Sequence, residues 1–367
     1  MSGILQSLLA SIGGAGGPFL YSWGLNSNGQ LGDNTTATKS SPIQIGSETT
    51  WSKVSGGQTF SSSIKTDGTL WTWGGNSVAQ LGDNTTIRRS SPVQIGALTN
   101  WSKLGVGGKN ITNGAIKTDG TLWMWGYNYS GSVGDNTTTG KSSPVQIGAL
   151  TNWSELSLGY RFTHAIKTDG TLWAWGINFD GMLGIDNRTY RSSPVQVGAL
   201  TDWSKVSGGG TFCAAIKTDG TLWAWGANSF GQLGDGTKIF RSSPVQIGAL
   251  TNWSKVSSGY SFVIAVKTDG TLWSWGRNFS GQLGDSSLID RSSPIQIGSA
   301  TDWSASSAGN SFSLAIKTNK IIWSWGANSN GQIGDGTVDY RSSPVQVGSN
   351  TWASITACSQ STLAIED

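Results

Sequence analysis

Residues 203–252 read WSKVSGGGTFCAAIKTDGTLWAWGANSFGQLGDGTKIFRSSPVQIGALTN, and this segment recurs along the chain with a step of about 50 residues. A repeat of this length built from short strands predicts a β-propeller, because one unit cannot bury its own faces. The Trp-Gly pair of the segment recurs at Trp23, Trp73, Trp125, Trp175, Trp225, Trp275 and Trp325. The Ser-Pro pair recurs at Pro42, Pro92, Pro144, Pro194, Pro244, Pro294 and Pro344.

Each repeat predicts one blade of four antiparallel strands. Asp219-Gly220 is a hairpin signal, because a tight turn needs positive φ angles that these residues tolerate. A long loop follows at 228–243. Pro244 is expected at the start of the last strand, where a missing N–H group costs least. The expected strands are residues 203–207, 212–217, 221–226 and 244–248.

Both faces of the third strand are apolar. Side chains alternate across a strand, so Trp223 and Trp225 share one face while Leu222 and Ala224 share the other. This pattern predicts that each blade is sandwiched between two neighbours. The small residue between the tryptophans leaves room for the next blade to approach.

The two ends of the repeat region are complementary. Residues 18–24 match a third strand, and residues 351–367 supply a first and a second strand. Pairing them closes the ring and leaves no open sheet edge between the first and last blades. The sequence therefore predicts an all-β protein, in which residues 18–367 form a seven-bladed β-propeller of four-stranded antiparallel blades. The closing blade is shared between the N- and C-termini.

Composition excludes several functional classes. Charged residues make up only 12% of the chain, and the formal net charge is +3. The basic stripe or tail that nucleic-acid binding usually needs is missing, and no apolar run is long enough to span a bilayer. Cys213 and Cys358 occupy non-equivalent positions in different repeats, so free thiols are favoured over a disulfide.

The repeats resemble those of the regulator of chromosome condensation family. The resemblance rests on the segment from Trp225 to Asp235, then Ser-Ser-Pro, then the Gly-Gly-x-x-Phe stretch, and it covers roughly residues 18–367. It implies a seven-bladed propeller with a shared closing blade. Family members include a nucleotide-exchange factor for the GTPase Ran, a bacterial inhibitor of β-lactamase and many interaction modules. We do not expect exchange-factor activity in this chain, because it lacks a basic arm and long loop insertions.

No set of residues suited to catalysis is recognisable. The single histidine, His164, lies in a second strand, where Ala214, Ile264 and Leu314 are its equivalents in other repeats. A semi-buried structural role is favoured for it. No nucleophile–base pair, metal-ligand cluster or phosphate-binding loop is apparent. We therefore expect no enzyme activity, no catalytic residue, no cofactor and no metal.

A carboxylate recurs after the Gly-Gln-Leu-Gly segment, with a basic residue six positions later. We expect each aspartate to fix its own long loop, and pairing with that cation is one way for it to do so. A ring of cation sites is the alternative. One repeat departs from the pattern, with Ile185 at the aspartate position and Asp186 next to it. The pairs are Asp33 and Lys39, Asp83 and Arg89, Asp135 and Lys141, Asp235 and Arg241, Asp285 and Arg291, and Asp335 and Arg341.

The two rims of the ring differ in variability. The Lys-Thr-Asp-Gly turn and the Ala-Leu-Thr-Asn linker are nearly fixed, and antiparallel order places both on one rim. The variable rim carries the loop between the first two strands and the long loop. Aromatic residues with arginine on such loops are typical of a recognition surface; the alternative is that they have drifted and pack onto the loops. They are Tyr127, Tyr129, Tyr160, Phe179, Tyr190, Phe230, Phe240, Tyr260, Phe279 and Tyr340.

Residues 1–17 lie outside the repeat. Helical periodicity places five apolar residues on one face, and residues 13–17 form a glycine-rich tether. A short apolar helix of this kind is expected to dock on a larger assembly. A signal peptide is the alternative, although no Lys or Arg precedes the apolar part. The docking residues are Ile4, Leu5, Leu8, Leu9 and Ile12.

The leader also resembles those of some phage structural proteins. We therefore expect a non-enzymatic propeller of bacterial or phage type that acts by binding. The first hypothesis is a virion component, tethered to a protein partner by residues 1–17, with the variable rim facing a host-surface protein or glycan. The alternative is a stand-alone bacterial interaction or inhibitor module.

Overall fold

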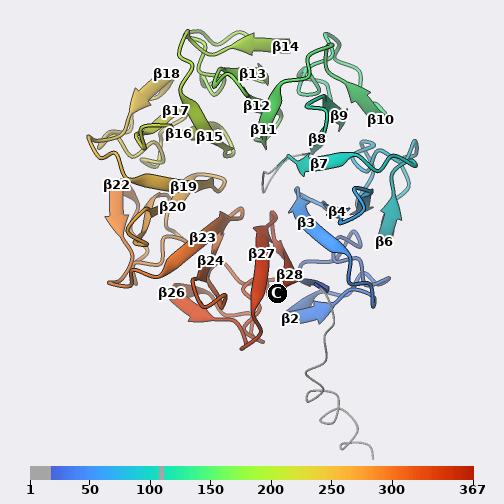
Figure 1. The fold of residues 1–367 in the computed structure, drawn as a ribbon. Coiled ribbons are helices and arrows are strands. Elements are labelled where there is room, and N and C mark those ends of the chain that lie inside the picture. The colour runs from blue at the N-terminus through green and yellow to red at the C-terminus, as the bar shows by residue number, and fades with distance from the viewer. Residues whose placement is uncertain (1–17, 106, 108–110) are drawn as a thin grey trace, which may run out of the picture.

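Seven sheets surround a common axis in the computed structural model, which describes residues 18–105, 107 and 111–367 (Figure 1). Each sheet in this part of the chain has four antiparallel strands. The predicted fold class, including the shared closing blade, is confirmed. The proposed docking segment at residues 1–17 lies outside the described residues.

In every blade except the closing one, the strands run from the axis outward in chain order (Figure 1). The inner strands are β3 (Trp51–Gly56), β7 (Trp101–Leu104), β11 (Trp153–Leu158), β15 (Trp203–Gly208), β19 (Trp253–Ser258), β23 (Trp303–Ala308) and β27 (Trp352–Ala357). The second strands are β4 (Phe60–Lys65), β8 (Thr112–Lys117), β12 (Phe162–Lys167), β16 (Phe212–Lys217), β20 (Phe262–Lys267), β24 (Phe312–Lys317) and β28 (Ser361–Glu366).

The third and outer strands complete the blades. The third strands are β5 (Leu70–Gly74), β9 (Leu122–Gly126), β13 (Leu172–Gly176), β17 (Leu222–Gly226), β21 (Leu272–Gly276), β25 (Ile322–Gly326) and β1 (Leu20–Gly24). The outer strands are β6 (Arg89–Gln94), β10 (Lys141–Gln146), β14 (Arg191–Gln196), β18 (Arg241–Gln246), β22 (Arg291–Gln296), β26 (Arg341–Gln346) and β2 (Lys39–Gln44). We number the blades 1 to 6 from β3–β6 to β23–β26, and blade 7 holds β27, β28, β1 and β2.

Blade 7 closes the ring by pairing the two ends of the repeat region. Strand β1 runs antiparallel to β28, with Leu20 opposite Ile365 and Gly24 opposite Ser361. Leu20 and Ile365 also pack in one buried cluster with side chains of blade 1. The order β2-β1-β28-β27 therefore matches the order of the other six sheets.

The outer strand begins earlier than the sequence predicts. Strand β18 starts at Arg241 rather than at Pro244, because a register shift places Arg241 opposite Gly226. Pro244 thus lies inside a strand, which is tolerated because the outermost strand has one unpaired edge. The hairpin at Asp219-Gly220 is confirmed, but only Gly220 has a positive φ, of 78°. Asp219 instead accepts hydrogen bonds from the backbone N–H and hydroxyl of Thr221.

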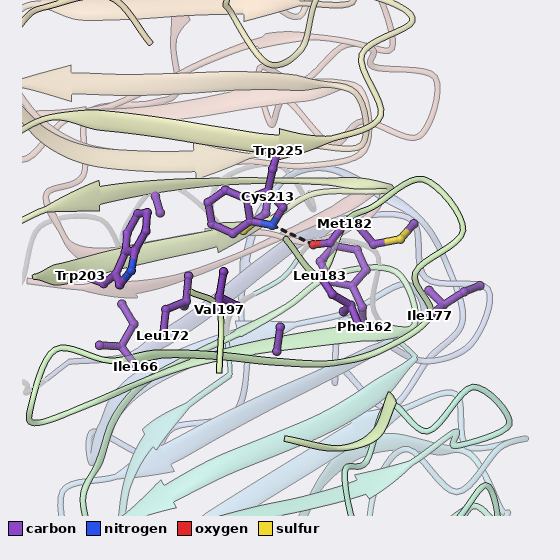
Figure 2. Close-up of a cluster of buried hydrophobic side chains, with 12 residues drawn as sticks. Phe162, Ile166, Leu172, Ile177, Met182, Leu183, Val197, Trp203, Cys213 and Trp225 are labelled. Atoms are coloured by element: carbon purple, nitrogen blue, oxygen red, sulfur yellow. Dashed lines mark hydrogen bonds between the residues drawn. The ribbon is translucent and has the colours of Figure 1, made fainter. Parts of the chain in front are cut away.

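The core lies between blades rather than within them. Figure 2 shows one such cluster, in which Phe162, Leu172 and Val197 of blade 3 face Trp203 and Trp225 of blade 4. As predicted, the two faces of β17 pack against different neighbouring blades. Trp223 and Trp225 contact blade 3, whereas Leu222 and Ala224 pack towards blade 5.

The buried tryptophan of each third strand ties its blade to the preceding one. Trp225 Nε1 donates a hydrogen bond of 2.9 Å to the carbonyl of Met182, drawn as a dashed line in Figure 2. Gly184 lies against the same indole, with a φ of 73°, and an added Cβ would lie 2.8 Å from Trp225 Nε1. Equivalent indole-to-carbonyl bonds are made by Trp23, Trp73, Trp125, Trp175, Trp275 and Trp325.

Deleting residues 351–367 tests the shared closure. The deletion removes β27 and β28 and leaves β1 and β2 as an isolated hairpin, which is marginally stable in water. Buried side chains including Trp352, Leu363 and Ile365 are lost, at about 2 kcal/mol each, so we expect Tm to fall by at least about 10 °C. Differential scanning calorimetry measures the change. Deletion of residues 1–17 is the control, and an unchanged Tm in the C-terminal deletion would contradict the closure.

Candidate functional site

The long loop of every blade is organised around a buried asparagine. In blade 4, Asn228 Oδ1 accepts a hydrogen bond from the N–H of Leu233 at 2.9 Å. Its Nδ2 donates to Asp235 Oδ1 at 3.1 Å and to the carbonyls of Thr237 and Ile239. Sequence analysis missed this role, although the asparagine recurs at a fixed place after Trp-Gly. The equivalent residues are Asn26, Asn76, Asn128, Asn178, Asn278 and Asn328, and all are buried.

The aspartate of Gly-Asp fixes the same loop, as the sequence predicts. Asp235 Oδ1 accepts from the N–H and hydroxyl of Thr237, while Oδ2 accepts from Arg241 Nε and Nη2 at 3.1 and 2.9 Å. Burial alone would raise the pKa of Asp235, but the hydrogen bonds from Thr237 and Arg241 outweigh it and lower the pKa. The expected carboxylate–cation pair is present in all six copies.

Blade 3 keeps its loop without the aspartate. Ile185 packs against the cluster between blades 3 and 4. Asp186 accepts a hydrogen bond from the hydroxyl of Ser243 in the next blade, at 2.9 Å. Asn187 Oδ1 accepts from the N–H of Thr189, and this bond corresponds to the one that Thr237 Oγ1 accepts from the N–H of Ile239 in blade 4. Each carboxylate therefore fixes its own loop, and the carboxylates do not act together as one ring.

Hydrogen bonds confirm the assignment of loops to rims. We call the rim that carries the Lys-Thr-Asp-Gly turns and the Ala-Leu-Thr-Asn linkers the conserved rim. There the N–H of Thr218 donates to the carbonyl of Asp202, which joins a turn to a linker. On the variable rim, the N–H of Ala227 donates to the carbonyl of Thr211, which joins the long loop to the loop between the first two strands.

None of the ten aromatic candidates of the variable rim is buried. The most exposed is Tyr129, at 76%. Five are exposed, namely Tyr129, Phe179, Tyr190, Phe279 and Tyr340. The other five are half-buried, namely Tyr127, Tyr160, Phe230, Phe240 and Tyr260. The rim aromatics are thus surface residues of the loops rather than part of the core between blades.

Arginines join several of these aromatics into stacks that span two blades. The guanidinium of Arg161 lies 4.9 Å from the ring centroid of Tyr127 and 4.8 Å from that of Tyr160. Tyr129 extends this stack, because its ring meets Tyr127 edge-on at 5.0 Å between centroids. Such contacts restrict the orientations of the exposed aromatic side chains.

A second stack repeats the arrangement on blades 4 and 5. The guanidinium of Arg277 lies 4.5 Å from the ring centroid of Phe230 and 4.2 Å from that of Phe279. Blades 2 to 5 carry nine of the ten candidates, blade 6 carries Tyr340, and blades 1 and 7 carry none. We call the nine residues on these four adjacent blades the aromatic surface.

His164 is more buried than the sequence analysis expected. Its side chain is fully buried and lies edge-on between the rings of Phe162 and Trp225, at 5.5 and 5.4 Å. Neither ring nitrogen has a well-formed hydrogen bond to the described chain. Burial lowers the pKa of His164 to about 3, against a smaller opposing effect of the Leu183 backbone. This imidazole is neutral and sealed from solvent.

The cysteines are buried free thiols, as expected. Burial raises the pKa of Cys358 to about 12 and raises that of Cys213 as well, so neither is a ready nucleophile. The described residues hold no group of three or more His, Cys, Asp or Glu placed to bind a metal ion. In the same part of the chain, no helix has the length and apolar character needed to cross a membrane.

The conserved rim contains a feature that sequence analysis missed. Lys217, which ends β16, lies over the rings of Trp203 and Trp223, at 5.1 and 4.2 Å from their centroids. It is only 6% exposed and also pairs with Asp202 at 3.3 Å. The repeated Lys-Thr-Asp-Gly lysines are thus packing residues rather than free surface charges. The sequence feature that indicates this packing is the recurrence of one lysine with two tryptophans in each repeat.

Fold and loop architecture together define a seven-bladed propeller of the regulator of chromosome condensation class. Residues 107–364 match the RCC1-like domain, and residues 19–64 and 67–110 match the regulator of chromosome condensation (RCC1) repeat. The chain belongs to this family. No curated protein sequence matches it.

Solved propellers superpose closely on this chain at low sequence identity. Prp20p from Saccharomyces cerevisiae is 18% identical, with a TM-score of 0.86 over 96% of this chain and 92% of that one. Yeast RCC1 (Prp20) bound to Kap60 is 18% identical, with a TM-score of 0.85 over 96% and 89%. Human WBSCR16 is 17% identical, with a TM-score of 0.85 over 95% and 99%. At these identities the likeness shows the shared fold.

Replacing His164 should remove a source of acid lability. The pKa is about 3 in the folded chain and about 6.5 when unfolded, so between these values only unfolded chains bind the proton and stability falls as pH falls. We expect the free energy of unfolding to drop by about 1.5–2 kcal/mol from pH 6.5 to pH 5. His164→Ala, which copies Ala214, should remove this drop.

Urea denaturation at the two pH values measures the difference. The chain has one histidine, so no other side chain of that type titrates in this window. His164→Leu, which copies Leu314, is a second variant that keeps more volume in the site. An equal pH dependence in wild type and both variants would show that the imidazole is not held neutral.

Proposed function

We propose that this chain is a non-enzymatic propeller that binds a protein partner through the aromatic surface of blades 2 to 5. The observation that carries the proposal is the pair of arginine–aromatic stacks, centred on Arg161 and Arg277. Aromatic residues and arginine are the side chains most enriched at binding hot spots.

The surface is built for contact rather than for packing within the chain. Tyr129, Phe179 and Phe279 occupy one repeated loop position, directly after the buried asparagine, and all three are exposed. Serine stands at this position in the other four copies. Since the fold does not need an aromatic there, a binding role accounts for the three that are present.

A binding role fits what the solved neighbours do. The yeast propeller is described with Kap60 as a bound partner, and its binding properties to Gsp1p and histones have been examined. The yeast neighbour thus has other proteins as its partners.

We further propose a bacterial or phage-type protein whose residues 1–17 attach the propeller to a larger assembly, with a virion as the first candidate. Five apolar residues with helical spacing and a glycine-rich tether support this attachment. In a virion, the aromatic surface would face a host-surface protein or glycan. A stand-alone interaction or inhibitor module is the second candidate, for which the rim alone suffices.

Loss of two exposed aromatics should weaken partner binding without unfolding the chain. For Tyr129→Ala with Phe179→Ala we expect a loss of about 1–3 kcal/mol per residue in binding, since exposed anchors lose their contacts. Tm should change little, because neither side chain is buried. Affinity capture with quantitative mass spectrometry identifies the partner, and calorimetry with that partner measures the loss.

The matched control lies on the conserved rim. Leu150→Ala with Leu250→Ala removes two apolar side chains that are each 48% exposed. Lys167 and Lys217 are unsuitable for this purpose, because they are buried over tryptophan rings. Equal weakening by the rim and control variants would place the binding surface elsewhere.

Copurification distinguishes the two assembly proposals. A virion component must be present in purified particles in a fixed ratio to the other structural proteins. Deleting residues 1–17 should then abolish incorporation while leaving the Tm unchanged, because these residues lie outside the repeat. Normal incorporation of the deleted chain would contradict docking through this segment.

A further inference from the structure

A ring of lysines lies around the propeller axis, on the side of the conserved rim. It is formed by the third residue of each inner strand, which pairs with the second strand close to the Lys-Thr-Asp-Gly turn, as Lys205 pairs with Ile216. Figure 1 shows these inner strands surrounding the axis. In order around the ring, the seven residues are Lys53, Lys103, Glu155, Lys205, Lys255, Ala305 and Ser354. We call this set the axial lysine group.

Three of its ammonium groups are positioned by the neighbouring blade. Lys53 donates a hydrogen bond to the carbonyl of Ser102, Lys103 to that of Ser154 and Lys255 to that of Ser304. Each carbonyl belongs to the next blade, so the lysines reach sideways around the axis. An ammonium has three donors, so the bond to one carbonyl leaves two of them in Lys53 and Lys255, while Lys103 gives a second donor to Glu155.

One carboxylate oxygen already bridges two lysines of the group. Glu155 Oε1 lies 3.2 Å from Lys103 Nζ and 3.5 Å from Lys205 Nζ, so lysines of blades 2 and 4 share the carboxylate of blade 3. These side chains remain open to solvent, at 44% for Lys103 and 53% for Lys205. Glu155 thus shows how the group holds an oxyanion.

On the opposite side of the axial lysine group, two lysines have no carboxylate beside them. Lys255 and Lys53 precede and follow this arc of the ring, and the small residues Ala305 and Ser354 stand between them. The ammonium of Lys255 reaches into this arc, to Ser304 of blade 6, whereas that of Lys53 reaches away from it, to Ser102 of blade 2. Both lysines are exposed, and in the described chain neither forms an ion pair. Ser354 Oγ is buried and has no hydrogen-bond partner in this part of the chain. Four lysines against one glutamate give the group a net charge of +3, which equals the formal net charge of the whole chain.

We propose that the axial lysine group binds a compact polyphosphate anion. Lysine binds phosphate as a point charge, and a polyvalent anion can contact several ammonium groups at once. Lys255, directed into the arc, and Lys53, directed towards blade 2, supply the unneutralised charge, and the small side chains of the arc leave room for the ligand. The site lies on the rim opposite the aromatic surface and is independent of the function proposed above.

Isothermal titration of the full chain with inorganic tripolyphosphate at low ionic strength tests the proposal. We expect one site per chain, with affinity that falls steeply as salt is added. Lys53→Ala with Lys255→Ala should weaken binding by about tenfold per lysine, since each removes a charged hydrogen bond. Glu155→Gln should strengthen binding, because it removes the only carboxylate in the group.

The matched control is Arg88→Ala with Lys238→Ala, which removes two exposed cations from the long loops of the variable rim. It lowers the net charge equally and should leave the affinity unchanged. Ser354→Lys adds a lysine to the open arc and should tighten binding, which keeps the proposal testable if the double-alanine variant folds poorly.

Three results would overturn the proposal. The first is the absence of tripolyphosphate binding by the wild-type chain. The second is equal weakening by the axial and control variants, which would indicate general attraction to a positively charged protein. The third is tighter binding of an oligoglutamate peptide than of tripolyphosphate, which would assign the site to an acidic protein segment instead.

Discussion

The hydrogen bond from a buried indole to the preceding blade is the interaction on which the ring depends. Trp225 Nε1 reaches the carbonyl of Met182, and the same bond recurs at every interface around the ring. The indole has to be buried to pack and has to find an acceptor once buried. The preceding blade's long loop supplies that acceptor, together with a glycine that lets the ring approach. One side chain therefore fixes blade spacing and loop position at once.

This coupling explains why the fold could be predicted from sequence and why its details could not. The repeat length, the Trp-Gly pair and the complementary ends reflect contacts that every blade makes, so periodicity alone reveals them. The start of β18 depends on a register shift opposite Gly226, which leaves no mark in the sequence. The packing of Lys217 over Trp203 and Trp223 joins three strands of one blade, and the recurrence of these residues does not by itself show that their side chains stack.

The candidate binding surface was predictable as a set of positions but not as an arrangement. Exposed aromatics on variable loops could be identified from comparison of the repeats. Their grouping could not, because Arg161 contacts Tyr127 across a blade boundary and Arg277 contacts Phe230 in the same way. Arg161 also has a positive φ of 66°, a conformation that costs energy for a residue with a side chain. The stack with Tyr127 and Tyr160 offsets part of that cost.

The loop frame separates what the fold requires from what is free to vary. Asn228 and Asp235 use their polar atoms to hold the loop, and their equivalents are present in nearly every blade. The residue after the asparagine points outward in all seven copies, and it is Ser229 in blade 4 but Tyr129 in blade 2. A mutation at this position changes the surface without disturbing the indole bond or the buried asparagine. A rigid ring with such positions can change its surface chemistry blade by blade through a few substitutions, as the aromatics at this position in blades 2, 3 and 5 illustrate.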